Sequence, residues 1–349
     1  MLVIDGSRGE GGGQMVRTSV AMATVTGTTT RLTRIRENRP TNGLSKQHVT
    51  AVQAVAEMAG STVHGNEVGS KNLFIIPGDQ QRNNIKINIG TAGSISLVLQ
   101  AMLLAARNHR QRLSIDITGG TNVMWAPPID SYQYLLFPLM RKMDIYADAQ
   151  VINRGFYPQG GGRVLATLDP IGEISPLDLG TLGEFKGIKG VCFSQRLPEW
   201  MATNMVTRCK EVLAPIADAD IEIQRTEGDS RGAGIVLVAE FENGMLGSNA
   251  LTSRGNPVEK TGEDAANDLL NEISSGSTLD VHTADQLLPY MAMATGRSQF
   301  TVSRISKHLL SQMDTLESFL DVTFGVERKD SIYRFTVTPG ENNEAIHPR

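Results

Sequence analysis

Cysteine is almost absent from this sequence. The 349 residues include only Cys192 and Cys209, and neither belongs to a CxxC pair. This shortage argues against a disulfide-rich secreted fold and a zinc ribbon. The sequence also lacks an apolar run long enough to cross a bilayer, and its first residues lack the basic-then-apolar order of a signal peptide. These absences predict a cytoplasmic protein without a membrane partner.

Aromatic residues are few, at 5%, and the net charge is only −4, so composition alone does not indicate a nucleic-acid partner. The charges are unevenly distributed, however. Residues 215–280 contain 13 acidic and four basic residues, whereas residues 31–46 contain five basic residues opposed only by Glu37. The basic segment could bind a polyanion or form an ordinary solvated face.

The chain is long enough for one large domain and a smaller one. One order of elements recurs three times: a strand, a helix opened by Gly or Asp, a strand, a helix and further strands. The three units begin near residues 1–5, 85–89 and 278–282. This pattern predicts an α+β fold whose main body has three repeated lobes of sheet plus helices, with the helices on one face of each sheet.

The second and third units are separated by residues 182–276. This segment has its own predicted strands (187–193, 220–225, 234–240) and helices (198–213, 259–274), and it contains most of the acidic surplus. We therefore expect a small inserted α/β domain at 182–276, and a catalytic body formed by residues 1–181 and 277–349.

The third unit contains a candidate nucleophile, His308. Its neighbours predict an amphipathic helix whose apolar face comprises Leu309, Met313, Leu316 and Leu320. A histidine in the first turn feels the positive end of the helix dipole, which lowers its pKa and favours the neutral, nucleophilic imidazole. The alternative is an ordinary surface histidine.

The first unit contains a glycine-rich segment, GSRGEGGGQ, at residues 6–14. Its backbone amides could approach an anion closely, although it matches neither a dinucleotide fingerprint nor a phosphate loop and could be a simple turn. Glu10 within it could hold a divalent metal beside phosphates. Arg17, on the apolar helix that follows, could bind phosphate or form an internal ion pair with Glu37 or Glu10.

Other polar residues stand out against their surroundings. Gln100 interrupts an apolar run, so it either bonds internally or reaches a ligand. Asp285 and Gln286 are predicted to open the helix 287–294, where an aspartate could be a simple cap. Further candidates for anion or ligand contacts are Arg36, Arg39, Gln47, His48, Pro127 and His282.

These residues lie in segments that together resemble the RNA 3′-terminal phosphate cyclase family. The segments are IDGSRGEGGGQMVRTSVAMATVTG, IRENRPTNGLSKQHVTAVQA, GTAGSISLVLQ, GGTNVMWAPP, RGFYPQGGG, TADQLLPYMAMATG and SKHLL. They span nearly the whole chain in the family's order. The resemblance implies a three-lobed body with an inserted domain. It also implies a ligase that uses ATP to convert an RNA 3′-phosphate into a 2′,3′-cyclic phosphodiester.

The resemblance also implies roles for individual residues. His308 would be adenylated by ATP and would pass AMP to the RNA 3′-phosphate, after which the 2′-hydroxyl would expel AMP. Glu10 would associate with Mg²⁺ or Mn²⁺. The phosphates of RNA or ATP would be bound by Arg17, Arg36, Arg39 and Gln47, and the adenylate by Gln100, Pro127, His282, Asp285 and Gln286. His48 matches a family position to which we assign no role at this stage.

The chain departs from the family pattern at three positions. His282 replaces a tyrosine common in bacterial relatives, and Ser311 and Gln312 replace a frequent Thr-Asn pair, which leaves the geometry around His308 open. Two other functions remain in view. One is a non-catalytic RNA-binding factor in ribosome assembly, whose relatives lack His308; the other is an enolpyruvyl transferase of similar lobed architecture. The oligomeric state, the preferred metal and the physiological RNA are left undetermined.

Overall fold

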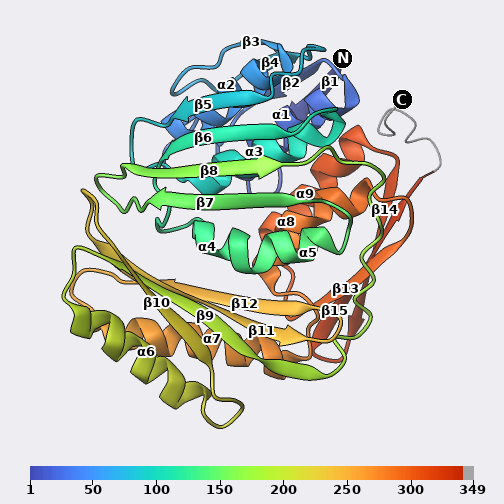
Figure 1. Ribbon diagram of the computed structural model, residues 1–349. Coiled ribbons are helices and arrows are strands. Elements are labelled where there is room, and N and C mark those ends of the chain that lie inside the picture. The colour runs from blue at the N-terminus through green and yellow to red at the C-terminus, as the bar shows by residue number, and fades with distance from the viewer. Residues whose placement is uncertain (341–349) are drawn as a thin grey trace.

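The fold of this protein combines helices with four β-sheets, as seen in a computed structural model that describes residues 1–340 (Figure 1). Within these residues, three sheets have four strands of mixed direction and one has three antiparallel strands. The expected α+β class is confirmed. In the same part of the chain, no helix is long and apolar enough to cross a membrane.

The first sheet has the strand order β1-β2-β4-β3, with β1 and β2 parallel and the other pairs antiparallel. Its helices α1 and α2 both end at a glycine in the left-handed conformation, Gly27 and Gly60, where a side chain would be strained. The elements are β1 (Leu2–Asp5), α1 (Gly13–Thr26), β2 (Thr30–Thr33), α2 (Lys46–Ala59), β3 (Thr62–His64) and β4 (Leu73–Ile76).

The second sheet repeats this arrangement in the order β5-β6-β8-β7, again with one parallel pair. The helical residues that follow β6 are divided into α4, η2 and α5, of which η2 is a wider π turn. Pro138 lies in the first turn of α5 and has no N–H to donate, so a regular α-helix loses a hydrogen bond there. The elements are β5 (Asn84–Asn88), α3 (Ile95–Ala105), η1 (Ala106–Asn108), β6 (Leu113–Gly119), α4 (Ile129–Ser131), η2 (Tyr132–Leu136), α5 (Phe137–Arg141), β7 (Ala147–Asn153) and β8 (Gly162–Leu168).

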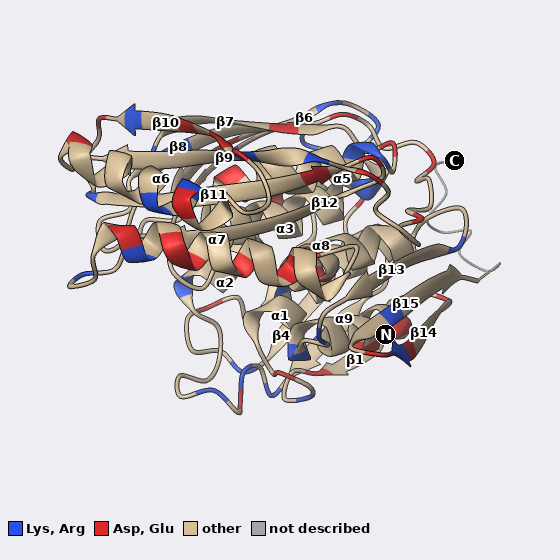
Figure 2. Ribbon diagram, turned by 90° about the horizontal axis from the view of Figure 1, so that it is seen from below, with Lys and Arg blue, Asp and Glu red and all other residues tan. Residues whose placement is uncertain are grey.

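Residues of the predicted insert form the third sheet, in the order β10-β9-β11-β12. Strand β12 was not predicted. Helices α6 and α7 pack together beside this sheet, around a core separate from the main one. Acidic side chains recur along α7 (Figure 2). The elements are β9 (Phe185–Gln195), α6 (Glu199–Leu213), β10 (Asp220–Thr226), β11 (Gly232–Phe241), β12 (Met245–Leu251) and α7 (Val258–Ser275).

The last sheet, β13-β15-β14, departs from the expected repeat. The strand predicted over 278–282 is wrong, because the Asp280 carboxylate accepts the N–H groups of His282 and Thr283 and starts a helix there. Residues 177–179 lie beside β13 instead, with Leu179 N–H donating to Gln299 O at 2.8 Å. The elements are α8 (Val281–Ala292), β13 (Ser298–Val302), α9 (Lys307–Phe319), β14 (Val322–Lys329) and β15 (Ile332–Pro339).

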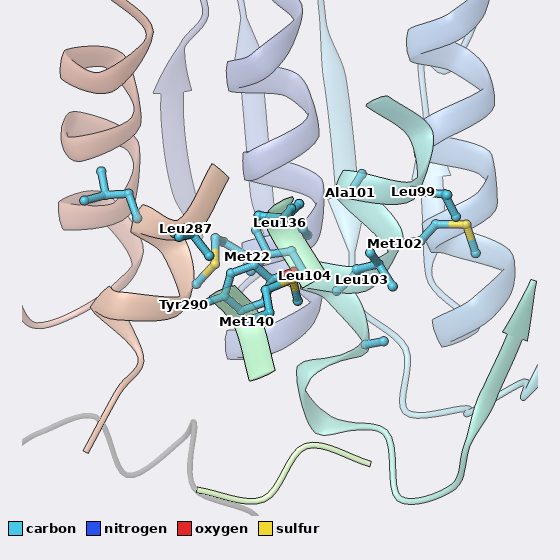
Figure 3. Close-up of a cluster of buried hydrophobic side chains, with 14 of the residues drawn as sticks. Met22, Leu99, Ala101, Met102, Leu103, Leu104, Leu136, Met140, Leu287 and Tyr290 are labelled. Atoms are coloured by element: carbon cyan, nitrogen blue, oxygen red, sulfur yellow. The ribbon is translucent and has the colours of Figure 1, made fainter. Parts of the chain in front are cut away.

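The main core is formed by helices that accompany different sheets. Helix α1 packs against α2, α3 and α9, and α8 packs against α9. Figure 3 shows side chains of α1, α3, α5, α8 and η2 meeting in one apolar cluster. The labelled members include Met22, Leu99, Leu104, Leu136, Met140, Leu287 and Tyr290. This packing brings the start of α1, after the glycine-rich segment, next to the start of α9.

Candidate active site

His308 lies in the first turn of α9, as predicted. Ser306 is the N-cap, and its hydroxyl accepts the N–H of Leu309 at 2.9 Å. Leu309 and Leu316 are buried in the main core, so the helix is anchored by its apolar face. The His308 side chain remains 47% exposed. Solvent and a ligand can therefore reach the ring.

Two acceptors face the same ring nitrogen of His308. Its Nδ1 lies 2.7 Å from Gln14 Oε1 and also meets the Glu10 carboxylate. A carboxylate has no hydrogen to give at neutral pH, so Nδ1 must donate and must carry the ring hydrogen. The lone pair of the neutral imidazole is then on Nε2, so Nε2 is the nitrogen of this ring that could act as a nucleophile.

Partial burial lowers the pKa of His308, and the positive charges of Arg17 and Arg39 act in the same direction. The charge of Asp285 opposes this shift. The direction agrees with the sequence-based expectation, although burial is the largest cause rather than a helix dipole. A lowered pKa favours the neutral form of His308 at physiological pH.

The glycine-rich segment is held against α9 through Glu10. Its backbone N–H donates to Ser311 Oγ at 2.8 Å, and its carboxylate pairs with Arg39. Further along α9, Gln312 Oε1 accepts the hydroxyl hydrogen of Thr18 at 2.8 Å. The departures at Ser311 and Gln312 thus join α9 to α1 and its preceding loop.

Arg17 is buried on α1, and its Nε donates to Gln100 Oε1 at 3.4 Å. Burial lowers its pKa to about 10, so it remains cationic at neutral pH. Among the described residues it has no carboxylate partner, since Glu10 pairs with Arg39 and Glu37 with Arg34. The alternative of an internal ion pair for Arg17 is therefore wrong. A buried cation without a counter-charge is suited to bind an anion.

His48 presents a fixed hydrogen-bond donor beside this cation. Its Nδ1 accepts the N–H of Ser45 at 3.1 Å, so Nε2 carries the hydrogen. A Cβ added at Gly13 would collide with this ring, which explains glycine at the start of α1. Burial, Arg17 and Arg36 together lower the pKa of His48 to about 3. The ring is therefore neutral and its Nε2–H points toward the N-terminus of α1.

The remaining predicted phosphate contacts surround these groups. Arg36 Nη1 donates to Gly43 O at 2.9 Å, and burial lowers the pKa of this guanidinium. Gln47 Oε1 accepts the N–H of Ser94 at 2.8 Å, which joins α2 to the turn before α3. Arg17 and Arg36 both lower the pKa of His48, and a Cβ added at Gly12 would lie 3.1 Å from Arg39 Nη2, so positive groups lie near the N-terminus of α1.

Asp285 is buried inside α8, and Ser306 donates its hydroxyl to the Asp285 carboxylate at 3.0 Å. The prediction that Asp285 opens this helix is wrong, because Asp280 is the cap. Burial raises the pKa of Asp285 to about 7. Gln286 lies nearby, with its Nε2 donating to His282 O at 3.1 Å and its buried Oε1 unpaired among the described residues. An unpaired buried acceptor is suited to a ligand donor.

Pro127 is joined to α3, because its carbonyl accepts the Ser96 hydroxyl at 2.6 Å. Within residues 1–340, no hydrogen bond or ion pair links Pro127 or the exposed His282 to His308, Glu10 or Arg17. The structure therefore brings together Glu10, Arg17, Arg39, Gln100, Asp285 and His308, and no contact of this kind joins Pro127 or His282 to them in residues 1–340.

The contact of Gln14 with His308 was not predicted from the sequence. The signal was present, because Gln14, Arg17 and Thr18 are polar residues spaced on one face of a mostly apolar helix. All three are buried and each contacts another helix or faces the site.

The described residues contain no group of three His, Cys, Asp or Glu side chains that could enclose a metal ion. Glu10 provides one carboxylate next to His308; its Oε2 is buried and its Oε1 pairs with Arg39. Mg²⁺ commonly binds proteins through one or two carboxylates together with substrate phosphates. The donor set fits a metal carried by phosphate groups rather than a closed protein site.

Comparison with known proteins identifies the family. The model of the RNA 3′-terminal phosphate cyclase family matches residues 8–326. The chain belongs to the RNA 3′-terminal phosphate cyclase family. It is 38% identical to the RNA 3′-terminal phosphate cyclase of Nitrosospira multiformis, over 98% of both chains. It is 39% identical to that of Methanococcoides burtonii and 38% identical to that of Caldivirga maquilingensis, over 97% of this chain and 100% and 98% of the relatives.

Proposed function

We propose that this member of the cyclase family converts the 3′-terminal phosphate of RNA into a 2′,3′-cyclic phosphodiester, using one ATP and releasing AMP and pyrophosphate. The observation that carries the proposal is the environment of His308. Its ring is half exposed and neutral, and its Nδ1 is held by Gln14 and Glu10. This leaves Nε2 free to attack phosphorus.

In the first step, Nε2 of His308 attacks the α-phosphorus of ATP, and the bond to the bridging oxygen of pyrophosphate breaks. The imidazole becomes positively charged as the P–N bond forms. The Glu10 carboxylate and Gln14 oxygen at Nδ1 stabilise that charge.

In the next steps, an oxygen of the RNA 3′-phosphate attacks the same phosphorus and releases His308. The neighbouring 2′-hydroxyl then attacks the activated 3′-phosphorus and expels AMP. This attack needs only positioning, because both groups belong to the same ribose. The cationic Arg17, Arg36 and Arg39 and the amide of Gln47 offset and orient the phosphate charge, and the neutral His48 adds a fixed N–H donor.

The adenylate pocket is assigned to Gln100, Pro127, His282, Asp285 and Gln286. Two features support this assignment: Asp285 lies close enough to influence the pKa of His308, and the buried Gln286 Oε1 lacks a partner among the described residues. A divalent ion, Mg²⁺ or Mn²⁺, would be held by Glu10 and would offset negative charge on the nucleotide phosphates.

We further propose that residues 1–181 and 277–349 form one three-lobed catalytic body, and that residues 182–276 form an inserted domain. The separate apolar core of the insert supports this division. So does the same strand order and direction in the first two sheets. The acidic α7 belongs to the insert, which we expect to lie away from the RNA path.

Incubation with ATP labelled at the α-phosphate tests the proposal. We expect an acid-labile AMP adduct on the parent protein and none on His308→Ala. Absence of an adduct from the parent, or equal labelling of the variant, would refute the proposal. Transfer to a 3′-phosphorylated RNA, followed by formation of a cyclic end, separates the cyclase from an ATP-dependent enzyme acting on another phosphate.

A further inference from the structure

Three large apolar side chains on two turns of the second unit are exposed. Trp125 is 95% exposed, Tyr157 76% and Met124 54%. Among the described residues, neither the Trp125 nor the Tyr157 ring stacks on another aromatic ring. Burial would remove these side chains from water, so a ligand that covers them is bound more favourably.

The two turns lie side by side. The N–H groups of Thr121 and Asn122 both donate to Gly155 O, at 2.9 and 3.2 Å, and Asn122 forms a parallel bridge with Phe156. These backbone contacts connect the segment before Met124 and Trp125 to the segment before Tyr157. The turns that carry the three exposed side chains are therefore neighbours.

This region adjoins the site through the turn at residues 90–93. A Cβ added at Gly160, in the turn of Tyr157, would lie 2.9 Å from Ala92 Cα. On the other side of the same turn, a Cβ at Gly93 would lie 3.5 Å from Gln47 Cβ. Lys46 places its Nζ 3.4 Å from Gly90 O and is exposed. The turns that carry the aromatic side chains, the exposed Lys46 and a proposed phosphate contact are thus neighbours.

The backbone holds Trp125 outward at a cost. Its φ is +66°, a left-handed conformation that bulky residues rarely adopt. Such conformations cluster where a ligand is bound, and packing cannot account for this one because the ring contacts almost nothing.

We infer that Met124, Trp125 and Tyr157 form a stacking platform for the bases that precede the terminal phosphate of the RNA. Single-stranded nucleic acid is commonly bound by exposed aromatic rings beside positive side chains. Here Lys46 would contact the RNA backbone while the rings contact the bases. This inference rests on the proposed function, since it requires RNA at the phosphate site.

Dependence of the reaction on RNA length tests the platform. A nucleoside 3′-phosphate has no preceding base, whereas a trinucleotide with a 3′-phosphate has two. We expect the parent to have a KM at least about fivefold lower for the trinucleotide, and Trp125→Ala to lose this advantage. Trp200→Ala, at the other tryptophan and on the exposed start of α6, is the matched control and should keep it. Equal KM values for both substrates in the parent, or an unchanged advantage in Trp125→Ala, would overturn the inference.

Fluorescence gives an independent measurement. In Trp200→Phe the only tryptophan is Trp125, and we expect the trinucleotide to quench its emission. Quenching by ATP alone would assign the ring to the nucleotide instead, and quenching caused only by raising the protein concentration would assign it to self-association; either result overturns the inference. Self-adenylation of Trp125→Ala should equal that of the parent. Failure of the parent to self-adenylate would instead refute the proposed function.

Discussion

The hydrogen bond between Gln14 and His308 provides a sharp test of how the nucleophile is prepared. Replacing Gln14 with methionine keeps a long unbranched side chain on α1 but removes the oxygen that lies 2.7 Å from His308 Nδ1. The ring then keeps one acceptor, the Glu10 carboxylate. We expect Gln14→Met to fold normally and to form the AMP–histidine adduct more slowly.

The expected magnitude follows from the loss of one hydrogen bond. A typical intramolecular hydrogen bond contributes about 0.5–1.5 kcal/mol, which corresponds to a rate reduced roughly 2- to 12-fold. The measurement is the single-turnover rate of labelling with α-labelled ATP at saturating ATP, so that binding does not limit it.

The matched control is Gln14→Glu, which retains an acceptor and adds a negative charge near the ring. We expect this charge to raise the pKa of His308. As the pH is lowered, the ring should then become protonated and the labelling rate should fall at a higher pH than in the parent. Cyclisation of RNA that already carries a 3′-adenylate does not use His308 and should proceed at the parental rate in Gln14→Met. A labelling rate within twofold of the parent, or an equal loss in the cyclisation step, would refute the positioning role.

Three further predictions concern other charged groups. Burial raises the pKa of Asp285 to about 7, so the parent loses stability as the pH rises from about 4 to 7. Asp285→Asn should therefore be more stable than the parent at pH 8, by at most about 4 kcal/mol, and nearly equal to it at pH 4. Thermal unfolding at the two pH values measures the difference. Arg154 and Asp130 form a buried pair at 2.8 Å beside the insert, so Arg154→Met should cost about 3–5 kcal/mol in denaturant unfolding, and adding Asp130→Leu should restore part of it. Arg36→Ala should raise the KM for RNA without slowing self-adenylation. Arg39→Ala also removes the partner of Glu10, so it should both raise the KM for RNA and slow self-adenylation. Equal effects of the two substitutions would contradict this distinction.

Local patterns predicted most elements because their causes are local. The apolar spacing of Leu309 and Leu316 and the hydroxyl of Ser306 suffice to start and orient α9. The errors have identifiable causes. Residues 278–282 have the composition of a strand, but Asp280 satisfies two backbone N–H groups and begins α8. Strand β12 lacks a strong alternating pattern and exists through its pairing with β11.

The candidate site was predictable in its residue types but not in its contacts. His308 and Glu10 are separated by nearly the full chain, and only the packing of α1 on α9 brings the carboxylate to Nδ1. Gln14 was missed although it shares one face of α1 with Arg17 and Thr18, because that spacing does not specify which side chain of another helix it meets. The partner of Arg17 was also open, since Glu37 and Glu10 were equally plausible until each was found with another arginine.

The amino-acid sequence by itself determined the class of fold, the family and the candidate nucleophile, because these depend on periodicity and on motifs that are continuous along the chain. Only the tertiary structure decided which nitrogen of His308 is nucleophilic, why His48 remains neutral and how Asp285 acquires a raised pKa. The physical reason is that hydrogen-bond geometry and desolvation depend on distances between atoms of different helices, and the linear order of residues does not specify those distances.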